Sequence, residues 1–249
     1  MAYGGDCVRD GPAPKLKKAF AIAVKDLRSE ARGKEIAPAM VLFALALVFI
    51  ATFAVPPGSG RAPVPPPVAG AVAVREVAAV LLWLAVLFAA ITGFGRSASA
   101  EQDGSRMDAL ALAPVDPMSL FAGKAAANLG FLAVLQVFLV PVWILFFGLP
   151  SRALFPEMFA VLVAADVGLA AAGTLFGAAS QYARSRHLIM PLLAFPALLP
   201  LVLSAARLTS TLALGGSFVS EVRWFVLLIV FDVVFVTLGA VLFQFVIEE

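Results

Sequence analysis

Two aspartates, Asp166 and Asp232, carry the chemistry that most needs explaining, because both lie inside long apolar runs. Each stands about eight residues after the start of its run, which at about 1.5 Å per residue is roughly 12 Å below the surface of a hydrocarbon core. A charged aspartate near the bilayer centre costs about 2.5–3.5 kcal/mol, so such residues usually face protein or water. Their matched depth suggests a shared polar region. Two interpretations remain open: a path or pocket for a polar group, or two protonated or hydrogen-bonded acids that hold the helices together.

Other reactive groups are scarce. The chain has one cysteine, Cys7, and one histidine, His187, so no disulfide framework or metal cluster can be built from them. The string nearest to a nucleotide-binding loop is Gly123-Lys124-Ala125, which lacks the Ser or Thr after the lysine and has Met118 where the first glycine belongs. We therefore expect no directly bound cofactor, no enzymatic activity of the chain alone, and ATP, if used, bound by a partner.

Long apolar runs define the fold class. Hydrophobic residues make up 62% of the 249 residues and charged residues 14%. The runs are Ile36–Val55, Val77–Gly95, Ala125–Gly148, Met158–Ser180, Leu188–Ala206 and Trp224–Ile247. Each is about as long as the roughly 20 residues that cross a bilayer core as a helix, and far longer than the strands of a membrane barrel. The sequence predicts an all-α membrane protein with six transmembrane helices.

The basic residues predict how the chain lies in the membrane. Six crossings would place 13 of the 18 Lys and Arg residues on the side of the N-terminus and the remaining 5 on the other side. The excess of positive charge predicts that both termini are cytoplasmic. Trp143 and Trp224 lie near predicted outer boundaries, as in an aromatic belt, whereas Trp83 lies deeper.

Three regions follow from these patterns. Residues 1–14 are rich in Gly and Pro and are expected to be a flexible N-terminal extension. In residues 15–34, apolar side chains such as Phe20 and Leu27 recur at helical spacing and basic ones such as Lys25 and Arg28 lie away from them. This pattern predicts a cytoplasmic amphipathic helix in the membrane interface; the alternative is a solvated positive segment that only determines topology. Residues 35–249 are expected to form the six-helix transmembrane domain.

The connector from Arg96 to Lys124 is the most structured loop. Ser105-Arg106-Met107-Asp108 fits a capping box, so a short helix should follow and end at Pro114. Asp116-Pro117 then fits an N-cap with proline at the first helical position, which predicts that a new helix starts there.

This connector also carries a family resemblance. The strings Phe94-Gly95-Arg96, Glu101-Gln102-Asp103-Gly104-Ser105, Asp108–Pro114 and Gly123-Lys124 resemble the first cytoplasmic loop of the haem exporter B family. Residues 173–206, with small residues, then basic Arg184-Ser185-Arg186, then spaced prolines, support the same resemblance. The family comprises membrane subunits of the ABC transporter for cytochrome c maturation, and the likeness runs from about Lys15 to the end.

The resemblance implies an ABC-2-type exporter-like fold in the bacterial inner membrane, with an N-terminal elbow helix and a short cytoplasmic coupling helix. It implies that a partner ATPase contacts Glu101, Asp103, Gly104, Met107, Asp108 and Leu110. The alternative is that these residues form an ordinary ordered loop.

The resemblance also implies the partners and the activity. The expected partners are the ATPase of cytochrome c maturation, a haem-handling membrane protein, a small accessory protein, the periplasmic haem chaperone, a second copy of the chain and the lipid bilayer, with no nucleic acid. ATP and haem would be bound by these partners. The chain would be a permease subunit that couples ATP hydrolysis to haem delivery and release of the chaperone. Alternatives are direct haem translocation, or export of a lipid, polysaccharide or drug.

Overall fold

The computed structural model describes residues 15–33, 36–54, 69–102, 117–147, 156–180 and 186–248. Every regular element within these residues is a helix. The elements are α1 (Lys15–Gly33), α2 (Ile36–Ala54), α3 (Ala69–Gln102), α5 (Pro117–Phe147), α6 (Pro156–Ser180), α7 (Arg186–Ala213), the 3-10 helix η2 (Phe218–Glu221) and α8 (Val222–Glu248). The expected extension at residues 1–14 lies outside the described residues.

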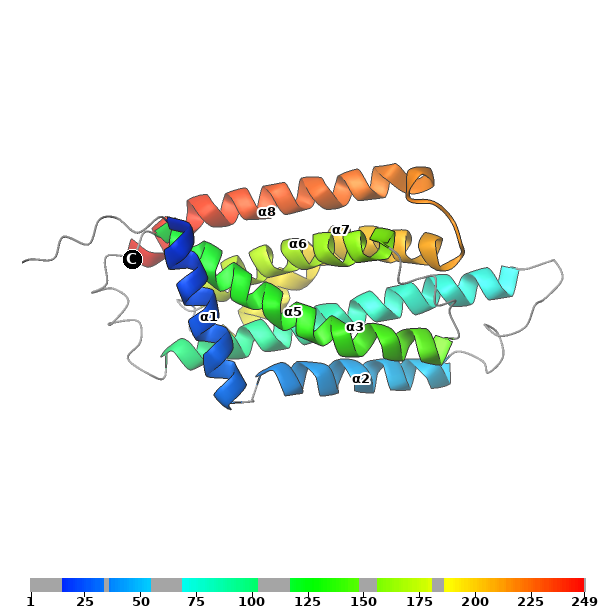
Figure 1. The fold of residues 1–249 in the computed structure, drawn as a ribbon, viewed down its shortest axis with the longest axis horizontal. Coiled ribbons are helices and arrows are strands. Elements are labelled where there is room, and N and C mark those ends of the chain that lie inside the picture. The colour runs from blue at the N-terminus through cyan, green and yellow to red at the C-terminus, as the bar shows by residue number, and fades with distance from the viewer. Residues whose placement is uncertain are drawn as a thin grey trace, which may run out of the picture.

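The long helices run side by side and alternate in direction, whereas α1 lies steeply across one end of the bundle (Figure 1). Five stretches are long and apolar enough to cross a membrane: Glu76–Gly95, Pro117–Phe147, Pro156–Ser180, Leu192–Ala213 and Val219–Phe243. The apolar part of α2, Ala37–Phe53, is shorter. The predicted all-helical membrane fold is therefore confirmed, with five candidate spans.

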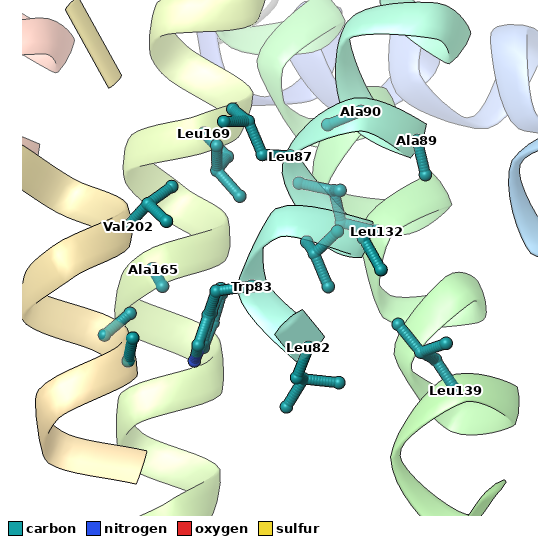
Figure 2. Packing of buried hydrophobic residues seen from close by; sticks show 14 of the residues in the cluster. Leu82, Trp83, Leu87, Ala89, Ala90, Leu132, Leu139, Ala165, Leu169 and Val202 are labelled. Carbon is teal, nitrogen blue, oxygen red and sulfur yellow. The ribbon is translucent and has the colours of Figure 1, made fainter. Parts of the chain in front are cut away.

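The core forms where α3 lies between α5 on one side and α6 with α7 on the other. Figure 2 shows Trp83 and Leu87 of α3 among Leu132 of α5, Leu169 of α6 and Val202 of α7. These side chains are almost completely buried. In sequence order α3, α5, α6 and α7 are neighbours, and their apolar faces close one continuous core.

Trp143 corrects the expectation of an aromatic belt at that position. Its side chain is fully buried, and its Nε1 donates a hydrogen bond to the Ala78 carbonyl oxygen at 2.9 Å. An indole buried in a helix bundle needs an acceptor for its N–H, and α3 provides one. Trp143 therefore ties α5 to α3 inside the bundle instead of facing the lipid headgroups.

The turn between α7 and α8 is capped at both ends. Gly215 adopts φ +82, and the Gly216 and Gly215 amides donate to the carbonyl oxygens of Thr211 and Leu212 at 2.9 and 3.0 Å. This is a Schellman motif, in which a left-handed residue ends the helix and glycine avoids the Cβ penalty. The Ser217 side chain then accepts a hydrogen bond from the Val219 amide and caps η2. The turn reverses the chain so that α8 packs back along α6 and α7.

Helix α1 docks on the first half of α5 through small residues. Ala19 and Ala23 are buried on α1, and Gly123 and Ala127 are buried on α5. A Cβ added to Gly123 would lie 2.9 Å from the Ala19 carbonyl oxygen, a backbone atom that cannot move without moving α1. Absent side chains thus let two helices approach closely, as small residues do at membrane helix interfaces.

We predict that Gly123→Leu displaces α1 from α5, because the new side chain would overlap the backbone of α1. Overpacking of this kind typically costs about 1–3 kcal/mol. Limited trypsin digestion of the purified chain measures the effect, since α1 is rich in Lys and Arg, and cleavage there should become several times faster. Ala126→Leu, at an exposed position three residues further along α5, is the control and should not change the digestion rate. Equal rates for both variants would contradict the docking.

Candidate functional site

Asp166 is held by an amide from the neighbouring helix. It lies on α6, ten residues after Pro156, and Gln136 lies on α5. Gln136 Nε2 donates a hydrogen bond to Asp166 Oδ1 at 2.7 Å, and both side chains are buried, with 7% and 4% of their surface exposed. In a hydrocarbon environment a buried carboxyl without a partner is costly, so this bond provides the compensation that the sequence requires.

A second hydrogen bond joins the same two helices. Asn128 Nδ2 donates to Thr174 Oγ1 at 2.8 Å, and the Thr174 hydroxyl in turn donates to the Ala170 carbonyl oxygen at 2.7 Å. Asn128 precedes Gln136 by as many residues as Thr174 follows Asp166, which corresponds to about 12 Å along each helix. We call Asn128, Gln136, Asp166 and Thr174 the polar seam. Two bonds at this separation determine how α5 and α6 are aligned.

Asp232 occupies a different environment. It is buried on α8 against Gly168 of α6 and Leu201 of α7, where a Cβ on Gly168 would overlap the carboxyl. Its Oδ1 atom is buried and has no hydrogen-bond partner among the described residues. The carboxyl therefore fits into the space that the glycine leaves, and packing alone holds it there.

The two acids lie at similar depth but on different sides of α6. Gly168, which Asp232 contacts, is two residues from Asp166, hence about 3 Å away along the helix axis and about 200° around it. Asp166 faces α5, whereas Asp232 faces the opposite side of α6. The structure thus places both acids at one level without bringing them together, and it does not unite them in the shared polar region suggested by their depth.

Sequence reasoning missed the partner of Asp166. No Lys or Arg lies within the apolar runs, and the residue that bonds to Asp166 is Gln136. Gln136 and Asn128 are uncharged polar residues within the neighbouring run, and an amide in an apolar run was the available signal. Such residues commonly form hydrogen bonds between membrane helices.

The proposed ATPase contact is described only at its first residue. Glu101 lies in the last turn of α3, about 9 Å beyond Gly95, where the apolar stretch of that helix ends. Asp103, Gly104, Met107, Asp108 and Leu110 lie outside the described residues. Helix α5 begins at Pro117, as the Asp116-Pro117 pattern predicts. The ends of α3 and α5 that border the connector lie at the same end of the bundle as α1 and the end of α8 (Figure 1).

The polar groups of this region connect helices to one another. The hydrogen-bonding groups of the polar seam are paired with one another. Among the residues that the structure describes, no group of three His, Cys, Asp or Glu side chains could hold a metal ion. Two side-chain hydrogen bonds join α5 and α6, whereas the Asp232 carboxyl meets α6 by close packing at Gly168.

We predict that Gln136→Leu destabilises the chain by about 1–2 kcal/mol, because Asp166 would stay buried without its donor. Gln136→Leu combined with Asp166→Leu should recover most of this loss, since neither polar group then remains. Thermal unfolding of the purified chain in detergent measures both variants. Asn128→Leu is the matched comparison and should cost less, because Thr174 keeps its bond to Ala170. Additive losses in the double variant would contradict the pairing.

Comparison with known families gives a nearly full-length match. The family model described as CcmB protein matches residues 17–248 of this chain, from the first turn of α1 to the last residue of α8. No curated protein matches the chain. The family match covers every described helix and agrees with the apolar spans, so the chain belongs to the CcmB protein family, the membrane permease component of the haem export system of cytochrome c maturation.

Proposed function

We propose that this chain is the permease subunit that couples ATP hydrolysis in a partner ATPase to haem delivery and release of the periplasmic haem chaperone. Because α3 runs to Gln102 and α5 begins at Pro117, the connector expected at Arg96–Lys124 shortens to residues 103–116. The ATPase of cytochrome c maturation would engage this connector together with Glu101. The haem-handling membrane protein, the small accessory protein, the periplasmic chaperone and a second copy of the chain would complete the assembly. ATP and haem would be bound by these partners.

The observation that carries the proposal concerns the lengths of α3 and α5, the two helices that border the connector. Both are longer than a helix needs to be to cross the hydrocarbon core of a bilayer. The apolar stretch of α3 ends at Gly95 but the helix continues to Gln102. Helix α5 has 31 residues, so it is about 46 Å long against a hydrocarbon core of about 30 Å. Helix α3 thus continues past its apolar stretch toward the connector, and α5 begins directly after the connector. A force on such a connector would tilt both helices.

The contacts of α5 support coupling over a haem path through this chain. A tilt of α5 would move α6 through the polar seam and α1 through Gly123. A haem path would instead need ligands that converge on an open region. The seam residues bond to one another, and the side chain of Met40 is buried against α3 beside Gly93.

We also propose that α2 is a sixth span, so that both termini lie in the cytoplasm and the chain spans the bacterial inner membrane. Helix α2 has 19 residues, about 28 Å, which suffices for a core of about 30 Å with slight local thinning. The exposed cations Lys17, Lys25 and Arg28 lie on α1, at the connector end. Their position supports a cytoplasmic connector by the positive-inside rule.

We predict that single cysteines will report this topology in intact cells. Native Cys7 and a Ser105→Cys variant should react with a membrane-impermeant maleimide only after the membrane is opened. Ser59→Cys should react without opening, since α2 and α3 would separate residue 59 from both other positions. The variants are made in a Cys7→Ser background. Labelling of both Cys7 and Ser59→Cys from outside would show that α2 does not cross, and labelling of Ser105→Cys from outside would remove the connector from the ATPase side.

We predict that Asp108→Lys or Leu110→Asp abolishes copurification of the ATPase and lowers cytochrome c maturation at least tenfold, while the amount of inserted chain stays unchanged. Either substitution would place the wrong charge in a small contact, and like charges or buried unpaired charges cost several kcal/mol at interfaces. Glu221→Lys makes a comparable charge change at the far end of the bundle and should leave both measurements intact. Normal ATPase copurification with both connector variants would refute the assigned contact.

A further inference from the structure

Helix α1 presents more than the face that docks on α5. Ala19 and Ala23 are buried, whereas Lys17, Lys25 and Arg28 are exposed. We call these three exposed basic residues the cationic strip. Between the docked face and the strip lies Phe20, with 71% of its surface exposed. The exposed surface of α1 therefore combines an aromatic ring with three cations, and its surroundings must accommodate both an apolar and a positively charged group.

The register of the helix separates these features by direction. At about 100° per residue, Arg28 lies roughly 180° and Lys17 roughly 160° from Ala19, on the side away from α5. Phe20 lies roughly 100° from Ala19, on one flank. Helix α1 therefore points its packing surface, its aromatic side chain and its charges in three distinct directions.

Close contact with α5 keeps α1 from rolling about its axis. A Cβ at Gly123 would meet the Ala19 carbonyl oxygen and the Ile22 side chain, and one at Gly130 would meet Leu27. Contacts at two points on α5 thus hold two successive parts of α1 in one rotation. The orientation of the cationic strip and Phe20 is consequently a built-in property of the fold.

The charge of the strip is only partly balanced within α1. Lys25 Nζ lies 3.2 Å from Asp26 Oδ1, an ion pair whose lysine is 60% exposed. Such exposed pairs contribute little and leave the lysine available to other anions. Lys17 and Arg28 add two further exposed positive charges. The strip therefore favours a polyanionic surface over a neutral one.

We infer that the cationic strip binds the headgroups of anionic phospholipids while Phe20 inserts beneath them. The inference rests on the membrane placement proposed above and does not depend on the ATPase. Helix α1 lies across the end of the bundle, as a helix in the membrane interface would (Figure 1). Phosphate groups offer acceptors to ammonium and guanidinium groups, and an aromatic side chain is stable at the boundary between headgroups and acyl chains. Charge complementarity selects anionic over zwitterionic lipid.

The full chain, purified without the ATPase and placed in nanodiscs of phosphatidylcholine and phosphatidylglycerol, tests this inference. After transfer to mild detergent, the phospholipids that stay bound are quantified by mass spectrometry. The wild-type chain should retain phosphatidylglycerol preferentially. Lys17→Gln combined with Arg28→Gln should lower that preference on the order of tenfold, because each basic residue near an anionic surface contributes a factor of several. Higher salt should reduce the wild-type preference in the same direction.

Arg207→Gln combined with Arg223→Gln removes the same number of exposed charges from the other end of the bundle and is the matched control. It should retain most of the preference. An equal loss in the two double variants would reveal a general effect of net charge and overturn the inference. Unchanged lipid retention in the α1 variant, together with lost copurification of the ATPase from cells, would also overturn it, in favour of a protein partner for the strip. Failure of the connector variants to affect the ATPase would not alter the lipid result, so the two proposals fail separately.

Discussion

Inside a hydrocarbon layer, a buried polar side chain that its own helix cannot satisfy needs a partner on a neighbouring helix, and this constraint organises the bundle. The polar seam satisfies it between α5 and α6, where Gln136 bonds to Asp166 and Asn128 to Thr174. The indoles of Trp83 and Trp143 satisfy it at two other junctions, with Thr209 of α7 and Ala78 of α3. Each of these bonds supplies a partner that lipid cannot offer to a buried polar group. These hydrogen bonds join α5 to α6, α3 to α7 and α5 to α3.

The junction between α6 and α8 differs because it contains no side-chain hydrogen bond among the described residues. The two helices have an extensive contact, yet Asp232 Oδ1 meets Gly168 without a hydrogen bond. Only a small share of the α8 span is buried in the chain, and most of its apolar side chains face outward. A shift of α8 along α6 would break none of the interhelical hydrogen bonds described above. A shift of α5 along α6 would break two. The bundle thus consists of a bonded set of helices with α8 packed against it.

Hydropathy predicted the order of the apolar helices, because the hydrophobicity of a helix is a sum over its run of residues. Of the six predicted spans, five are long and apolar enough to be candidate spans, and the apolar part of α2 is shorter. It did not predict that α3 extends from Ala69 to Gln102, since turns outside the lipid need no apolar residues. The start of α5 at Pro117 was predictable because N-caps and proline leave a local signal. The partner of Asp166 was not, because the rotation of one helix against another depends on the whole packing. The burial of Trp143 could not be predicted for the same reason. The sequence indicates how deep this side chain lies in the membrane, but it does not indicate whether the side chain faces lipid or the neighbouring helix.

The position of α5 explains how one connector could act on a bundle of this kind. Helix α5 adjoins the connector and contacts α1, α2, α3, α6 and α8. A displacement at residues 103–116 would reach the polar seam through one continuous helix, without crossing a flexible loop. From the seam it would pass to α6 by hydrogen bonds and to α8 by packing alone, so the last step is the least constrained. In the proposed coupling, the hydrogen-bonded junction would transmit the force, and α8 could shift against α6 without breaking a hydrogen bond of the polar seam.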